Sequence, residues 1–285
     1  MKKLFLAALA TIMLTGCGKE GYDWGSKEQQ QDGYGQVTLS LSEGNTVYVK
    51  STSEADGSYN VTTTNEKGGV AALTGEYSVI KEKGAVTVPV GAYSISAENI
   101  TASEAETANG GRGQAHYAGK STFNVAQGGS TPVSFTCEMV NSKVTFDYDD
   151  TFANMFHMSA TAEVTQVPTI VATPTNSLTA NRSVTLVGDI NHQTQAAESY
   201  YTVNENGTAL NFTITAARKS DGEVKTFQAT TPITLQKKTW HKVKIAASTT
   251  NGQATVTINV DGTITEAEEV TVTVDPYTSS SVQGE

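Results

Sequence analysis

The sequence predicts an all-β protein made of two tandem antiparallel β-sandwiches. Apolar and polar residues alternate over short stretches, as in Val37–Leu41, Tyr77–Val79, Val86–Val90 and Val256–Val260. Turn pairs such as Asn206-Gly207 separate these stretches, and no long stretch shows an apolar repeat of 3.6 residues. Alternation with period two is typical of strands, and many short strands with regular turns are typical of antiparallel sandwiches.

The N-terminal sandwich is expected over residues 36–140 and the C-terminal sandwich over residues 141–285, which end in a polar tail. A boundary near residue 140 makes each half about the size of one sandwich domain. Short helical turns are expected at Ser103–Ala108 and Asp149–Met155. One larger sandwich remains the alternative, because the strand pattern fits it too.

The N-terminus carries an export signal. Two lysines precede the uninterrupted apolar run Leu4–Leu14, which is too short to span a membrane. The next residues complete Leu14-Thr15-Gly16-Cys17, which resembles the lipobox of bacterial lipoproteins. The resemblance implies that residues 1–16 are a signal peptide and that Cys17 becomes the first mature residue, carrying acyl chains such as palmitate. The alternative is a plain signal peptide with a chance cysteine.

A polar, Gly- and Gln-rich stretch follows, and residues 17–35 are expected to form a flexible tether between the lipid and the folded body. The chain has 29 acidic and 19 basic residues, a net charge of −10. An acidic surface repels phosphates, so nucleic acid is not expected as a partner. Two cysteines are too few for a disulfide scaffold, and stability must come from packed cores.

Short motifs along the chain resemble an exported Bacteroidetes lipoprotein family that is catalogued as a domain of unknown function. They include Val88–Tyr93, Asn141–Val144 and Trp240–Val243. That family is distantly similar to the fimbrillin and Mfa-like lipoproteins. The resemblance implies two transthyretin-like sandwiches on a lipid anchor at the outer membrane or cell surface. In fimbrillins it also implies strand donation between subunits after cleavage at an arginine.

This sequence departs from the fimbrillin pattern at the cleavage site. Its arginines are Arg112, Arg182 and Arg218, and none lies near the first predicted strand, Gln36–Ser42. Arginine-specific removal of that strand is therefore not expected. The stretch Gly110–Gly113 lacks the signature of a phosphate-binding loop and is interpreted as a flexible, exposed loop that a protease nicks after Arg112.

The residues that catalysis requires are scattered. Cys137 shares a strand face with Val133 and Met139, which predicts a thiol that points into the core and is inert. The four histidines show no metal-binding spacing, and the acidic cluster around Asp149 lacks the pattern of a calcium loop. The sequence thus predicts no enzyme, no cofactor and no metal site.

The candidate interaction surfaces are the aromatic side chains and the last predicted strand. Tyr200 and Tyr201 are adjacent, so their rings are expected on opposite faces of a strand. Trp240 begins a strand and is interpreted as a core residue. The last strand, Glu269–Asp275, is expected to complete its own sheet, with addition to a partner's sheet edge as the alternative.

Together these observations predict a lipid-anchored, non-enzymatic protein of the outer membrane that displays an adhesion or interaction surface. The membrane is contacted through the anchor, and the partners at the cell surface are proteins or glycans. The anchor is expected to face the cell exterior, with the periplasmic face as the alternative. Two alternative functions stay open: a fimbria or pilus subunit that assembles by strand addition, and a surface glycan-binding protein.

Overall fold

The computed structural model describes residues 33–45, 51–175, 178, 182–187, 198–229, 232–250, 253–262 and 268–274. All of them belong to one compact unit, Gly33–Glu285. The predicted signal peptide, the lipidated Cys17 and the tether up to residue 32 lie outside the described residues. None of the helices in the described part of the chain has the length and apolar character to cross a membrane.

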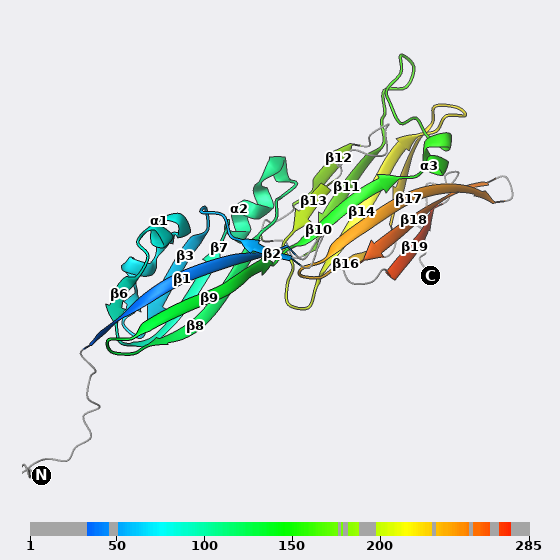
Figure 1. The fold of residues 1–285 in the computed structure, drawn as a ribbon. Coiled ribbons are helices and arrows are strands. Elements are labelled where there is room, and N and C mark those ends of the chain that lie inside the picture. The colour runs from blue at the N-terminus through cyan, green and yellow to red at the C-terminus, as the bar shows by residue number, and fades with distance from the viewer. Residues whose placement is uncertain are drawn as a thin grey trace, which may run out of the picture. The chain divides into compact units, whose positions relative to one another are not determined.

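The first sheet has nine strands within the described residues (Figure 1). Two strands pair with opposite ends of its first strand. The strands are β1 (Tyr34–Asn45), β2 (Ser51–Glu54), β3 (Asn60–Asn65), β4 (Gly68–Gly69), β5 (Gly75–Glu76), β6 (Val86–Pro89), β7 (Gly91–Glu98), β8 (Tyr117–Val125) and β9 (Ser130–Met139). Their order is β2-β1-β9-β8-β7-β3-β4, with β5 on β3 and β6 on β1. The first strand begins at Tyr34, two residues before its predicted start.

Alternate residues of this sheet face a core that short helices help to cover. The helices are η1 (Ala71–Leu73), α1 (Tyr77–Glu82), α2 (Ala102–Thr107) and η2 (Asn109–Gly111). Ile95 and Val61 are buried in the core together with Ile80 of α1. The backbone N–H of Leu41 donates a hydrogen bond to the Tyr77 hydroxyl at 3.0 Å, which ties α1 to β1.

The remaining described strands form two five-stranded sheets. They are β10 (Ser142–Tyr148), β11 (Thr169–Pro174), β12 (Val184–Val187), β13 (Glu198–Tyr201), β14 (Thr208–Ala217), β15 (Val224–Gln228), β16 (Ile233–Leu235), β17 (Trp240–Thr250), β18 (Gln253–Gly262) and β19 (Glu268–Val274). One sheet has the order β13-β10-β17-β18-β19, and the other has β12-β11-β14-β15 with β16 on β14. Helix α3 (Asp150–Met155) follows β10.

A single core joins these two sheets into a sandwich. Phe146 and Val243 come from one sheet, Phe212 and Ile214 come from the other, and all belong to one buried cluster. The Phe146 and Phe212 rings meet edge to face at 5.5 Å between centroids. The predicted all-β sandwich fold is confirmed.

The strand pairing differs from the prediction in one respect, because it is not wholly antiparallel. Strand β1 runs parallel to β9, and β10 runs parallel to β17. Each parallel pair joins strands that are far apart in sequence, and the intervening chain supplies the crossover that a parallel pair requires. Alternation along one strand carries no information about the direction of its neighbour.

Both predicted helical turns are present, while the α-helix α1 and the short 3₁₀-helices η1 and η2 were missed. Helix α2 begins with a capping box between Thr101 and Glu104, and the Asp149 carboxylate caps α3. The alternation of Tyr77 and Val79 predicts a strand, which is wrong, because these residues lie in α1. Tyr77 and Ile80, three residues apart on one helix face, are the buried pair, and Val79 is 49% exposed.

The last described strand completes its own sheet, as expected. Strand β19 pairs antiparallel with β18, with Val270 opposite Val260 and Val274 opposite Val256. It lies at one end of the strand order of its sheet.

Two alanine substitutions distinguish helix from strand at α1. Ile80→Ala should lower the free energy of unfolding by about 2–5 kcal/mol, because it empties a buried position. Val79→Ala is the matched control and should change it by less than about 0.5 kcal/mol, since that side chain faces solvent. Urea unfolding measures both. Equal losses in the two variants would mean that the segment is not this helix.

Candidate functional site

The outer face of the sheet that contains β13, β10 and β17 carries two aromatic side chains with a lysine between them. Lys143 pairs with Tyr200 on one side and with Trp240 on the other. Successive residues of a strand point to opposite faces, so these side chains point away from the core that holds Val144 and Tyr201. Together with Lys242, also on the outer face, they are called the aromatic–lysine row.

Cations lie against the ring of Trp240. The Lys143 Nζ lies 4.7 Å from the centroid of the Trp240 ring, and the Lys242 Nζ lies 4.3 Å from it. The Lys143 Nζ is also 5.9 Å from the Tyr200 ring centroid. These distances are in the range of cation–π attraction. The Trp240 Nε1–H donates a hydrogen bond to the Thr145 Oγ1 at 3.0 Å, which fixes the indole on the outer face.

Glu198 holds the row in place. Its Oε2 lies 2.8 Å from the Lys143 Nζ, and its Oε1 accepts a hydrogen bond from the Tyr200 hydroxyl at 2.5 Å. The Lys143 side chain is 4% exposed, so its charge requires this compensation. One carboxylate therefore orients both the lysine and the tyrosine.

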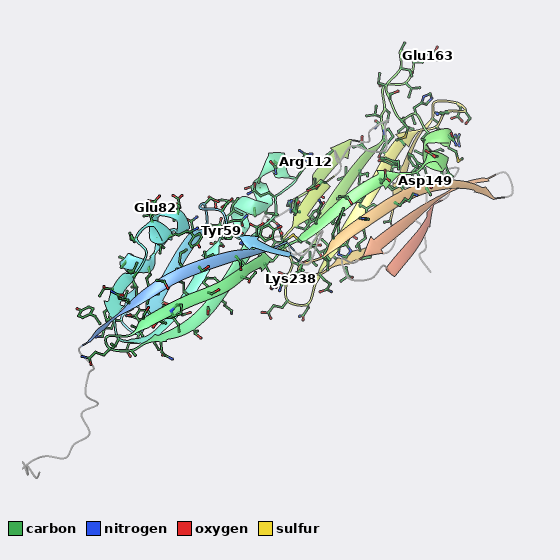
Figure 2. The ribbon with its side chains drawn as sticks, in the orientation of Figure 1. Tyr59, Glu82, Arg112, Asp149, Glu163 and Lys238 are labelled. Carbon is green, nitrogen blue, oxygen red and sulfur yellow. The ribbon has the colours of Figure 1, made fainter. Side chains whose placement is uncertain are left out.

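An open cavity of about 250 Å³ lies beside Tyr200. It is lined by Asn109, Arg112 and Gly113 from the turn that follows α2, and by Glu198 and Tyr200 from β13. Figure 2 labels Arg112 in this turn. We call it the Tyr200 cavity. It combines an aromatic ring with a carboxylate, an amide and a guanidinium.

The turn that forms one wall of the cavity contains residues in the left-handed backbone region, and their types suit that region. Asn109 has φ 53°, and Gly110 and Gly113 have φ 68° and 80°. Asparagine and glycine are the residues that adopt this region most readily. The Asn109 Nδ2 closes the turn by donating to the Gly113 carbonyl at 2.9 Å.

Backbone contact fixes the turn against β13. The Tyr200 N–H donates to the Arg112 carbonyl at 2.8 Å. A Cβ on Gly113 would lie 2.6 Å from the Tyr200 carbonyl oxygen, so only glycine fits there. The interpretation of Gly110–Gly113 as a flexible, exposed loop is wrong, because the backbone of its last three residues is bonded or closely packed.

The buried guanidinium of Arg182 is the link between the turn, α2 and β13. Its Nη2 donates to the carbonyls of Gly111 and Tyr200 at 2.9 and 2.7 Å. Its Nη1 lies 3.5 Å from the Glu106 Oε1, and the two side chains are 5% and 1% exposed. Burial lowers the pKa of Arg182, while the neighbouring Tyr201 and Glu106 oppose that change.

The residues singled out for catalysis do not meet at this face. Cys137 is fully buried, and burial, followed by the charge of Glu43, raises the pKa of its thiol to about 12. The predicted position of the thiol in the core is confirmed. His241 is buried as well, and burial lowers its pKa to about 4. Its Nε2 lies 2.9 Å from the Thr239 Oγ1.

The acidic cluster serves helix α3. Asp149 accepts hydrogen bonds from the N–H groups of Thr151 and Phe152 at 2.9 and 3.1 Å. Over the described ranges, no group of three or more His, Cys, Asp or Glu side chains is placed to hold a metal ion.

The aromatic predictions have two outcomes. Tyr200 and Tyr201 do face opposite sides of β13, with Tyr201 fully buried. The interpretation of Trp240 as a core residue is wrong, since its indole lies among outward-facing lysines. The missed signal is the phase of β17: His241 and Val243 are buried, so Trp240 and Lys242 must face outward.

A second open groove of about 510 Å³ lies over β3, β7 and β8. Its lining includes Thr62, Ser96, Gly119, Lys120 and Lys237. These side chains are small or flexible, and no aromatic ring lines the groove. The Tyr200 cavity is the better defined of the two, because contacts on both sides fix its walls.

Comparison with known proteins places the chain in a family. A family model described as "Domain of unknown function (DUF4493)" matches residues 33–276. The match confirms the resemblance to a family catalogued as a domain of unknown function. No curated protein matches the chain.

Solved structures of low identity are similar to the chain along most of its length. A "putative cell adhesion protein" from Bacteroides uniformis has 12% identity and a TM-score of 0.42, over 79% of this chain and 96% of that chain. One from Bacteroides eggerthii has 12% identity and a TM-score of 0.39, over 81% and 95%. "Putative polysaccharide binding proteins (DUF1812)" from Bacteroides thetaiotaomicron have 11% identity and a TM-score of 0.36, over 79% and 96%.

A substitution at Gly113 tests the docked turn. Gly113→Ala should lower the free energy of unfolding by about 1–3 kcal/mol, because it adds both left-handed strain and a clash with the Tyr200 carbonyl. It should also speed trypsin cleavage after Arg112. Gly110→Ala is the control in the same turn: its Cβ meets nothing within 4 Å, so its cost is about 1 kcal/mol of backbone strain.

Urea unfolding and timed trypsin digestion with mass spectrometry measure both effects. If the wild-type protein were cut after Arg112 as fast as Gly113→Ala, the turn would be exposed and would not be packed against β13.

Proposed function

The chain belongs to the DUF4493 family, and we propose that it is a lipid-anchored, non-enzymatic protein of the cell envelope that displays an interaction surface. The observation that carries the proposal is the aromatic–lysine row: Tyr200, Lys143, Trp240 and Lys242 form one continuous outward-facing row across three strands. Tryptophan and tyrosine are the residues that contribute most to binding where they are anchored at an interface.

The row is organised before any partner arrives. Glu198 fixes Lys143 and Tyr200, and Thr145 fixes the Trp240 indole. Side chains that are already held in one geometry lose little conformational entropy on binding, so more of the contact energy becomes affinity. A row of this kind suits recognition, because the rings supply contact area and the exposed Lys242 supplies charge.

A role in binding rather than catalysis fits the state of the reactive side chains. The Cys137 thiol and the His241 imidazole are buried, and their pKa values are shifted away from the range that general acid–base or nucleophilic chemistry uses. Neither side chain lines the Tyr200 cavity.

The anchor is proposed from Leu14–Cys17, whose resemblance to a lipobox implies an acylated Cys17 at the mature N-terminus. Two or three acyl chains hold a protein stably on a bilayer, at about 0.8 kcal/mol per buried methylene. The outer membrane, with the folded body at the cell exterior, is the proposed location.

Assembly by strand addition is the second candidate function. Strand β19 ends the strand order of its sheet, so its outer edge has no neighbour among the described strands. A strand from another subunit would add there through backbone hydrogen bonds. Ladders of native protein on SDS gels without boiling would support this candidate, and a single monomer band would exclude it.

Acylation is tested by palmitate labelling. Cells grown with radiolabelled palmitate should label the wild-type protein and not Cys17→Ala, because the thiol is the acylation site. Cys137→Ala is the control that removes the other cysteine and should keep the label. Equal labelling of Cys17→Ala and wild type would refute the anchor, and protease shaving of intact cells would show whether the body is exposed.

The interaction surface is tested by adhesion. Cells that produce Trp240→Ala should adhere several-fold less to protein- or polysaccharide-coated plates than wild-type cells, because the indole is the largest side chain of the row. Val224→Ala removes an exposed side chain from the other sheet and should leave adhesion unchanged. Equal adhesion of wild-type and Trp240→Ala cells, at equal surface amounts, would remove the row as the interaction surface.

A further inference from the structure

We propose that the Tyr200 cavity binds one sugar residue of a polysaccharide or glycan chain. This inference rests on the proposed function, because it names the ligand class of the same outer face. The cavity, about 250 Å³, lies just below the roughly 300–1,000 Å³ of sites for drug-sized molecules, so it suits a single ring.

The aromatic wall provides the apolar half of sugar recognition. Tyr200 is half-buried, and its hydroxyl is held by Glu198 at 2.5 Å, so its ring keeps one orientation beside the cavity. A pyranose ring has faces of C–H groups that pack against an aromatic face, whose electron density attracts them. A tyrosine contributes this contact area at low cost in conformational entropy.

The polar walls supply both acceptors and donors. The Glu198 carboxylate has about four lone-pair sites, and the Tyr200 hydroxyl and the Lys143 ammonium each engage one of its oxygens. Glu198 also lines the cavity, which brings its carboxylate within reach of a ligand there. The Arg112 guanidinium and the Asn109 amide add N–H donors and a carbonyl acceptor on the opposite wall.

A sugar is the ligand whose hydrogen bonding matches this set. Each hydroxyl donates one hydrogen bond and accepts up to two, so adjacent hydroxyls need acceptors and donors side by side. Phosphate-rich ligands fit less well, because a carboxylate lines the cavity and the chain carries a net charge of −10.

The two walls are held at a fixed separation. Arg182 binds the carbonyls of Gly111 on one wall and Tyr200 on the other, and the Tyr200 N–H binds the Arg112 carbonyl. The site therefore does not need to close around its ligand, and its selectivity is built into the resting structure.

The test is a glycan array probed with the full-length protein purified in detergent, followed by calorimetry with the best-bound oligosaccharide. Tyr200→Ala and Arg112→Gln should each weaken binding about tenfold or more, since each removes one wall contact. Lys120→Ala, in the groove over β7 and β8, is the matched control and should leave the Kd unchanged. Circular dichroism confirms that each variant is folded.

A second readout uses only the wild-type protein. Trypsin cleaves after arginine, and Arg112 lines the cavity. In a digestion long enough to cut part of the ligand-free protein after Arg112, the bound oligosaccharide should slow that cleavage at least several-fold, while cleavage elsewhere in the chain keeps its rate. Trypsin protection tests whether the sugar binds in the Tyr200 cavity even if Tyr200→Ala does not fold.

The inference would be overturned by an array without hits, by binding that Tyr200→Ala and Arg112→Gln leave intact, or by binding that only Lys120→Ala removes. Palmitate labelling and Trp240-dependent adhesion to protein-coated plates would survive such a result, and the proposed function would then stand without the sugar. Loss of those two, with sugar binding retained, would instead remove the proposed envelope function.

Discussion

The arrangement of the outer face depends on one buried guanidinium. Arg182 donates to the carbonyls of Gly111 and Tyr200 and lies 3.5 Å from Glu106, in a place where both charged side chains are almost fully shielded from water. A buried charge is costly unless it is paired and hydrogen-bonded. Its neighbours must therefore keep their positions, and this requirement holds the turn after α2 against β13. Without that docking there would be no Tyr200 cavity and no fixed end to the aromatic–lysine row.

Along the aromatic–lysine row, too, single side chains position more than one neighbour. Glu198 compensates Lys143 and orients Tyr200, and Lys143 in turn lies over the Trp240 ring. Each of these contacts therefore positions a neighbour on the outer face of the sheet, while the core beneath is closed by apolar residues such as Val144 and Val243. The core-facing residues of this sheet close the sandwich, and its outward-facing residues form the surface that we propose for interaction.

The sequence predicts what depends on local pattern and misses what depends on distant partners. Alternation identified most strands, and the apolar neighbours of Cys137 predicted its burial. The two expected helical turns lie within one residue of α2 and α3. Helix α1 was missed because Tyr77 and Val79 imitate a strand, and only the burial of Ile80 decides between the two. The parallel β1–β9 pair and the contacts of Arg182 with Gly111 and Glu106 join residues about 70 or more positions apart, so no local pattern contains them. The outward position of Trp240 was readable from its phase with Lys242, but its neighbours Lys143 and Tyr200 lie on other strands.

Arg182 and Glu106 dock the turn on β13 and so shape the outer face that we propose as the interaction surface. Amide hydrogen exchange at Tyr200, whose N–H binds the Arg112 carbonyl, measures that docking directly. The comparison is wild type against Arg182→Met/Glu106→Met, which removes both charges together and leaves neither one buried alone. Amide exchange at Tyr200 should be slow in wild type and much faster in the double variant, while the exchange of Val144 stays unchanged. Equal protection of Tyr200 in both proteins would contradict it.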